Sequence, residues 1–92
     1  MYYVYVLYSK KYRRFYIGLT NNLKRRIEEH NSEENKGWTE KFRPWILAYY
    51  EAYLTASEAR KREISLKYHG KIWTYLKKRI LQSLKGAAMS VP

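Results

Sequence analysis

The segment from Tyr16 to His30 contains the polar side chains whose types and spacing most clearly suggest chemistry. It reads as the end of a strand, a short polar turn and then a helix. At about 100° per residue, Arg26 and His30 both lie on the side of Leu23, where the apolar stripe of that helix begins. A guanidinium and an imidazole are therefore expected to face inward beside the strand that carries Tyr16. Alone, Arg26 is typical of a surface charge or a phosphate contact, and His30 of a hydrogen-bonded helix residue or a catalyst.

Glu63 is the most informative carboxylate of the chain. In the helix that follows Thr55, Ala59 and Leu66 define an apolar stripe, and Glu63 falls inside it. Burial of an unpaired carboxylate is unfavourable, so Glu63 is expected to have a partner. Two interpretations stay open: an ion pair with Lys67 one turn later, or ligation of a divalent metal whose shell is completed by water and a substrate phosphate.

Tyr5 and Tyr16 project from the two strands of one expected hairpin and can share a face. Two tyrosines among eleven are also typical of a core or of an aromatic platform. Phenols near several cations would have a lowered pKa, as a tyrosine base requires. Gly18 indicates a place where another group approaches the backbone closely.

A small set of strands and helices must position these side chains. Three strands are expected where β-branched and aromatic residues dominate, over residues 2–8, 14–19 and 45–53. Three helices are expected where apolar residues recur at helical spacing, over residues 22–32, 55–68 and 72–84. Thr55 and Glu58 form a capping box at the second helix, and Gly70 is expected to end it. The remaining acidic residues are expected to be solvent-exposed.

The order β-β-α-β-α-α predicts an α/β or α+β fold, in which helices cover at least one face of a small sheet. Residues 1–85 are expected to form a single domain, and residues 86–92 a disordered tail. Neither an internal repeat nor a linker is evident. No Walker loop, zinc-ligand spacing or nucleophile–histidine–acid set is present.

The composition favours an anionic partner. The 92 residues include 19 Lys and Arg against 8 Asp and Glu, a net charge of +11. Such a field on a small domain favours DNA or RNA over an anionic membrane surface, while a role in solubility alone is the plainer interpretation. The absence of cysteine excludes disulfides and thiolate metal sites. No segment has the length of a signal peptide or a membrane span, so a cytoplasmic protein without membrane contact is expected.

Four ordered pieces of the sequence resemble the GIY-YIG nuclease family. Tyr16-Ile17-Gly18 matches the second triad of the family name, and Tyr3-Val4-Tyr5 stands where the first triad is found. The segment from Tyr16 to His30 is similar to the arginine helix of the family, and Ser57 to Lys67 to its glutamate helix. The resemblance spans residues 2–81. Its layout is similar to that of stand-alone small bacterial members related to the nuclease module of nucleotide-excision repair.

This resemblance implies a three-stranded, largely antiparallel sheet flanked by helices, and hydrolysis of DNA phosphodiester bonds with one Mg²⁺ or Mn²⁺. It implies that Glu63 is the metal ligand and that Tyr5 is the general base or orients the attacking water. Tyr16 would position water or the scissile phosphate. Arg26 would stabilise charge on the phosphoryl oxygens, and His30 would assist at the same site.

One departure from the family pattern concerns the first triad, where Tyr3 replaces glycine and can alter the floor of the cleft. A DNA-targeting domain is also missing, so the selection of branched, nicked or flap DNA in repair or recombination would come from this surface or from a partner protein. Two rival functions remain. One is a non-catalytic nucleic-acid-binding module that retains the fold. The other is a scaffold that docks through the helix from Trp73 to Leu84 onto a partner or onto a second copy of itself.

Overall fold

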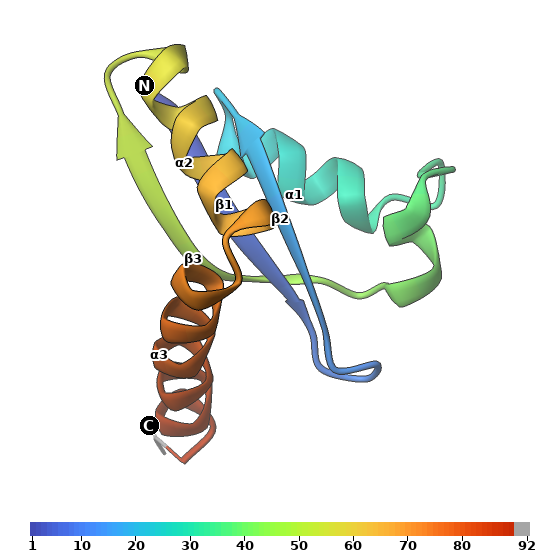
Figure 1. Ribbon diagram of the computed structural model, residues 1–92. Helices are drawn as coiled ribbons and strands as arrows, with labels where there is room; N and C mark the ends of the chain where they lie inside the picture. The colour runs from blue at the N-terminus through green and yellow to red at the C-terminus, as the bar shows by residue number, and fades with distance from the viewer. Residues whose placement is uncertain (90–92) are drawn as a thin grey trace.

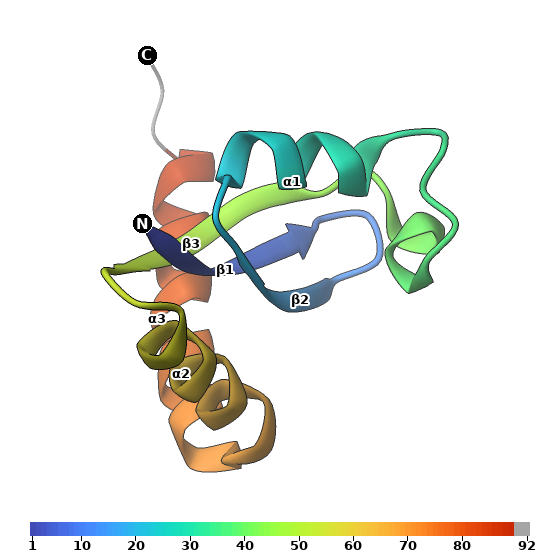
Figure 2. The same ribbon diagram turned by 90° about the horizontal axis from the view of Figure 1, so that it is seen from above.

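The computed structural model describes residues 1–89 and shows a three-stranded antiparallel sheet with helices on both faces (Figures 1 and 2). The strand order is β2-β1-β3. The strands are β1 (Tyr2–Ser9), β2 (Arg14–Thr20) and β3 (Ile46–Tyr53). The helices are α1 (Leu23–Asn31), the short 3₁₀ helix η1 (Trp38–Phe42), α2 (Ala56–Tyr68) and α3 (Gly70–Met89). The α+β architecture expected from the sequence is confirmed.

The central strand β1 is buried on both faces because both of its neighbours are antiparallel strands and helices lie above and below it. Alternation sends Val4 and Val6 to one face, where they pack with residues of α2 and α3. Tyr5 and Leu7 point to the other face and pack with Trp45 and residues of α1. Figure 2 shows α1 and α2 on opposite sides of the sheet.

Side-chain caps fix where two of the helices begin. The Asn22 side chain accepts a hydrogen bond from the backbone N–H of Arg25 at 3.0 Å, and Thr55 accepts one from the N–H of Glu58 at 3.2 Å. These caps satisfy amides that have no partner inside the helix. The capping box is modified, because Glu58 accepts from the Thr55 hydroxyl at 2.8 Å.

The end of the chain differs from the sequence-based expectation. Gly70 was expected only to end α2, but it is the first residue of α3. A single residue, His69, lies between the two helices. Helix α3 continues to Met89, so residues 86–89 of the expected tail are helical, while residues 90–92 lie outside the described part of the chain. Among the described residues, no helix is both long and apolar enough to cross a membrane.

The apolar stripe of α3 is already used within the domain. Leu76 and Ile80 are buried in the core formed with Val4 and Val6, and Trp73 and Leu84 pack against the same core. This stripe is therefore not free to dock onto a partner, and docking through the remaining surface of the helix stays a prediction.

Gly18 makes room for the ring of Tyr5, its partner across the β1–β2 pair. A Cβ atom built on Gly18 would lie 2.3 Å from the Tyr5 hydroxyl oxygen and 2.4 Å from Cζ. No side chain can be accommodated at these distances without displacing the ring. The close approach expected at Gly18 is thus made by the Tyr5 phenol.

We expect Gly18→Ala to lower the free energy of unfolding by about 1–3 kcal/mol, because the added methyl group must push the buried Tyr5 ring out of its position. Urea denaturation followed by circular dichroism measures this change. Gly86→Ala is the matched control, since a Cβ there meets no atom within 4 Å and alanine favours the helix. Equal stability of the two variants would contradict the steric role of Gly18.

Candidate active site

A solvent-open hollow of about 160 Å³ lies between β2, α1 and the segment that leads into η1. Three of the site residues predicted from the sequence line it: Tyr16, Arg26 and His30. The inward orientation predicted for Arg26 and His30 is therefore confirmed. The other lining residues are Glu29, Asn35, Gly37, Trp38 and Thr39.

Tyr5 lies beneath this hollow and contacts it through His30. Tyr5 is 1% exposed, and its hydroxyl is 2.9 Å from Nε2 of His30. The other ring nitrogen of His30, Nδ1, is 2.9 Å from Oγ1 of Thr39. Asn35 donates to that same Thr39 oxygen at 2.7 Å and to the backbone carbonyl of His30 at 2.8 Å. A continuous polar chain thus runs from the central strand to η1 and fixes the imidazole.

The His30 imidazole is neutral at physiological pH. Burial, followed by the positive charge of Arg26, lowers the pKa of His30 from 6.5 to about 4, while Glu29 opposes this change. A neutral imidazole has one donor and one acceptor nitrogen. His30 therefore donates one of its two hydrogen bonds and accepts the other.

The Tyr5 phenol is also neutral, contrary to the expectation of a lowered pKa. Burial raises the pKa of Tyr5 to about 12, although Arg26 acts in the opposite direction. Tyr16 and Glu63 raise it further. Desolvation outweighs the nearby cation because the ring is enclosed in the core. Tyr5 is therefore suited to hydrogen bonding rather than to action as a phenolate base.

Arg26 supplies positive charge at the rim of the hollow. Its side chain is 38% exposed, and its Nη1 lies 3.8 Å from the Oε1 of Glu29, one turn away. An ion pair this long and this exposed contributes little to stability. The guanidinium can therefore exchange this contact for a better anion, such as a phosphate oxygen.

Glu63 is not among the residues that line this hollow. It is 5% exposed and lies on α2, on the side of the sheet opposite α1. One carboxylate oxygen accepts from Nη1 of Arg60 at 2.9 Å, and the other accepts from Nζ of Lys67 at 3.2 Å. The ion pair with Lys67 predicted from the sequence is confirmed, and Arg60 adds a second partner that the sequence analysis missed.

Tyr16 connects the two sides of the sheet because β2 is an edge strand. Besides the first hollow, Tyr16 borders a second one of about 290 Å³, which Lys67 and Leu66 of α2 also line. Lys67, an ion-pair partner of Glu63, therefore lines the second hollow together with Tyr16. Tyr16 also lines the first hollow, together with Arg26 and His30.

The surroundings of Glu63 fit a metal site with a single protein carboxylate ligand. Within residues 1–89, no three His, Cys, Asp or Glu side chains gather as a metal site. A protein cage for a metal is therefore not available there. A single carboxylate does suffice for Mg²⁺ when water and a substrate phosphate supply the other ligands. Arg60 and Lys67, whose side chains are 64% and 38% exposed, can move to make room.

Sequence analysis missed the contribution of the segment between α1 and β3. No strand or helix is expected from the sequence over residues 33–43, yet Asn35 and Thr39 hold His30 and Trp38 borders the hollow. The one available signal was a tryptophan in an otherwise polar stretch. Hydrogen bonds made across the fold leave no periodic pattern in the sequence.

Glu51 also departs from expectation, since it is partly buried rather than solvent-exposed. Arg62 donates to its two oxygens at 2.8 and 2.9 Å, which lowers the pKa of Glu51 despite its burial. The hydroxyls of Tyr49 and Tyr53 donate to the same carboxylate. This cluster ties β3 to α2 and has a structural role.

Comparison with known proteins gives consistent matches. A family model described as the GIY-YIG catalytic domain matches residues 1–76. A UPF0213 protein of Staphylococcus haemolyticus is 37% identical over 65 residues, which make up 71% of this chain and 78% of that protein. A UPF0213 protein of Bacillus pumilus is 40% identical over 63 residues, or 68% of this chain and 60% of that protein. The solution NMR structure of a UPF0213 protein from Bacillus halodurans is 33% identical, with a TM-score of 0.49, and the alignment covers 94% of this chain and 87% of that one.

We expect acid to destabilise the fold through His30. The unfolded chain binds a proton at this residue near pH 6.5 and the folded chain only near pH 4, so stability is full above 6.5 and falls as the pH decreases through this window. The loss reaches up to about 3 kcal/mol. Urea denaturation at a series of pH values measures it.

In His30→Gln, this part of the pH dependence should disappear. His69→Gln is the matched control, because His69 is exposed and its removal should leave the loss in place. An identical pH dependence of the wild type and His30→Gln would contradict the assignment.

Proposed function

The chain belongs to the GIY-YIG family, and from this premise we propose that it is a metal-dependent endonuclease that hydrolyses phosphodiester bonds of DNA. The observation that best supports this proposal is the hollow in which Tyr16, Arg26 and His30 meet. A guanidinium, a phenol and a neutral, hydrogen-bonded imidazole around one solvent-open hollow are suited to holding a phosphate and a water beside it. The net charge of +11 attracts a polyanion to this surface.

Arg26 is proposed to bind the non-bridging oxygens of the scissile phosphate. Its planar fork can donate two parallel hydrogen bonds, and its charge stabilises the extra negative charge that builds on these oxygens. The weak contact with Glu29 leaves the guanidinium available for this role.

Tyr16 and His30 are proposed to act on the attacking water. Tyr16 lines the hollow and can orient this water, while His30, whose two ring nitrogens are hydrogen-bonded to Tyr5 and Thr39, assists through this hydrogen-bonded chain. Tyr5 has a positioning role in this scheme, since its hydroxyl is hydrogen-bonded to His30 and its pKa of about 12 keeps it protonated. Thr39 orients the same imidazole from the opposite side.

Glu63 is proposed to hold the Mg²⁺ or Mn²⁺ together with water and the substrate phosphate. When bound, the metal would act as a Lewis acid on the phosphoryl oxygens and as a template for the reactants. Arg60 and Lys67 pair with both oxygens of Glu63, and their partly exposed side chains can move aside to admit the metal. We include four further points in the same proposal: the selection of branched or nicked DNA, a role in repair or recombination, a partner protein for targeting, and a cytoplasmic location.

Arg26→Ala should lower the rate of DNA cleavage by about 100-fold, because one preorganised donor to the transition-state charge is removed. Arg26→Lys should give an intermediate rate, since a lysine keeps the charge but loses the fork. Cleavage of end-labelled DNA under single-turnover conditions measures both rates. Full activity of Arg26→Ala would remove Arg26 from the site.

Glu63→Gln should abolish cleavage in Mg²⁺ or Mn²⁺ because the one proposed carboxylate ligand is lost. The assay compares single-stranded, duplex and branched DNA, each with and without metal. Glu33→Gln is the matched control, since Glu33 is an exposed acid and the substitution removes the same charge. Cleavage that is absent in the wild type, or equal in Glu63→Gln, would contradict the proposed hydrolysis.

A non-catalytic nucleic-acid-binding module is the second candidate function. It is favoured by one observation, namely that both Glu63 oxygens are already paired with cations. Such a module would bind DNA with steep salt dependence, and neither EDTA nor Glu63→Gln would alter its binding. The cleavage assay above separates the two functions.

A further inference from the structure

A row of four aromatic rings runs from the β1–β2 turn to the candidate active site. The rings of Tyr16 and Trp38 lie at 28° to each other with centroids 6.3 Å apart. Trp38 packs on Phe42 at 4.7 Å, and Phe42 packs edge-on with Tyr12 at 5.5 Å. The row therefore joins the turn between β1 and β2, the helix η1 and the strand that carries Tyr16. We call these four residues the aromatic row.

Two members of the aromatic row, Trp38 and Tyr12, are the most open to solvent. Trp38 is 51% exposed and Tyr12 is 42% exposed, whereas Phe42 is partly buried between them. Exposure of an indole to water is unfavourable, and exposed aromatic surface often marks a binding site. Phe42 acts as the support that keeps the other two rings in place.

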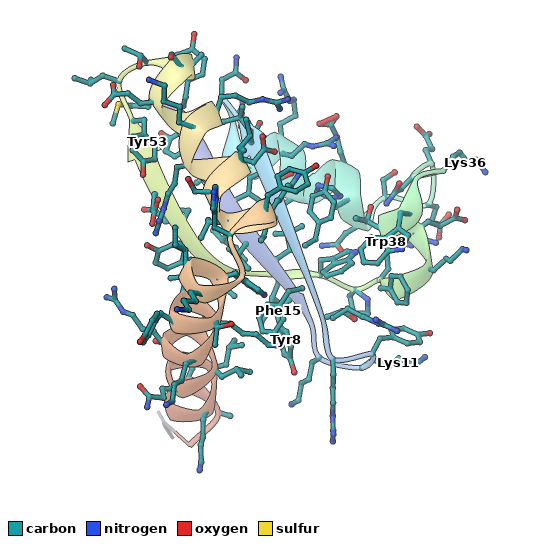
Figure 3. The ribbon with its side chains drawn as sticks, in the orientation of Figure 1. Tyr8, Lys11, Phe15, Lys36, Trp38 and Tyr53 are labelled. Carbon is teal, nitrogen blue, oxygen red and sulfur yellow. The ribbon has the colours of Figure 1, made fainter. Side chains whose placement is uncertain are left out.

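Cationic side chains accompany the row. Nζ of Lys11 lies 5.3 Å from the ring centroid of Tyr12, and Cζ of Arg14 lies 5.4 Å from that of Phe42. Figure 3 shows Lys11, Lys36 and Trp38 on the same side of the molecule, away from α3. Aromatic faces for bases and cations for the phosphates are thus available together.

This combination fits a single strand better than a duplex. Proteins that bind single-stranded nucleic acid stack successive bases on aromatic side chains and follow the backbone with positive charge. In a duplex the base faces are already stacked on one another and cannot reach Trp38 without unstacking. The row ends at Tyr16 in the hollow, so a strand that lies along it would bring a phosphate to Arg26.

We propose that the aromatic row binds single-stranded DNA and that Trp38 stacks on an unpaired base next to the phosphate bound by Arg26. The substrate class is then DNA that is single-stranded, or locally unpaired, at the point of cleavage. This inference rests on the proposed nuclease function for its catalytic meaning, but the binding itself needs no catalysis.

The test measures binding in EDTA, where no cleavage occurs, by fluorescence anisotropy of a labelled oligonucleotide in single-stranded and duplex form. Trp38→Ala should weaken single-strand binding by about 5- to 150-fold, the loss that corresponds to one stacked base, and leave duplex binding unchanged. Trp38→Phe should restore most of the affinity, because phenylalanine keeps an aromatic face. Equal losses for single strand and duplex, or no loss, would overturn the proposal.

Two controls make the result specific. Tyr75→Ala removes an aromatic side chain that is 78% exposed on α3 and should leave both affinities unchanged. Single-stranded DNA should also quench tryptophan fluorescence in the wild type and much less in Trp38→Phe, since Trp45 is buried and Trp73 is half-buried against Phe15, outside the row. This second measurement keeps the test valid if Trp38→Ala does not fold. Selective binding without cleavage in Mg²⁺ would refute the nuclease proposal and retain the aromatic row as a single-strand site.

Discussion

The hydrogen bond between the Tyr5 hydroxyl and Nε2 of His30 is the interaction on which the site depends. It joins the buried central strand to α1. A buried polar group without a partner lowers stability by about 1–3 kcal/mol, so loss of either residue of the pair would destabilise the fold. The phenol reaches the imidazole only because Gly18 leaves its space empty. Thr39 then holds the second ring nitrogen. One glycine, one phenol and one threonine thus orient an imidazole at the floor of the hollow.

Burial also decides the charges of this site. The pKa of Tyr5 rises to about 12 and that of His30 falls to about 4, so both groups are neutral near pH 7. Arg26 is then the main source of positive charge beside them, with Glu29 in weak contact. A hollow with neutral hydrogen-bonding groups at its floor and a cation at its rim suits the binding of an anion.

The two carboxylates Glu51 and Glu63 are both partly or fully buried and both are paired with cations. Glu51 is fully engaged by Arg62 and two tyrosines, which leaves no oxygen for a ligand. Glu63 is held by the two long, partly exposed side chains of Arg60 and Lys67. The entropy of holding such side chains in place makes these contacts weaker than their distances suggest. Glu63 is therefore the buried acid whose partners can be exchanged, and Glu51 is the one that stabilises the packing of α2 on β3.

Much of this arrangement was determined by the sequence alone. Helical periodicity placed Arg26 and His30 beside Tyr16 and Glu63 within an apolar stripe beside Lys67, since side-chain direction within one helix follows from residue spacing. Strand alternation put Tyr5 and Tyr16 on one face of the hairpin, and cap residues located the starts of α1 and α2.

Only the tertiary structure decided that α2 packs on the side of the sheet opposite α1, that Thr39 and Trp38 come to the hollow, and that burial raises rather than lowers the pKa of Tyr5. These features depend on distances between segments far apart in the chain and on exclusion of water. Both arise from packing, which local spacing does not encode.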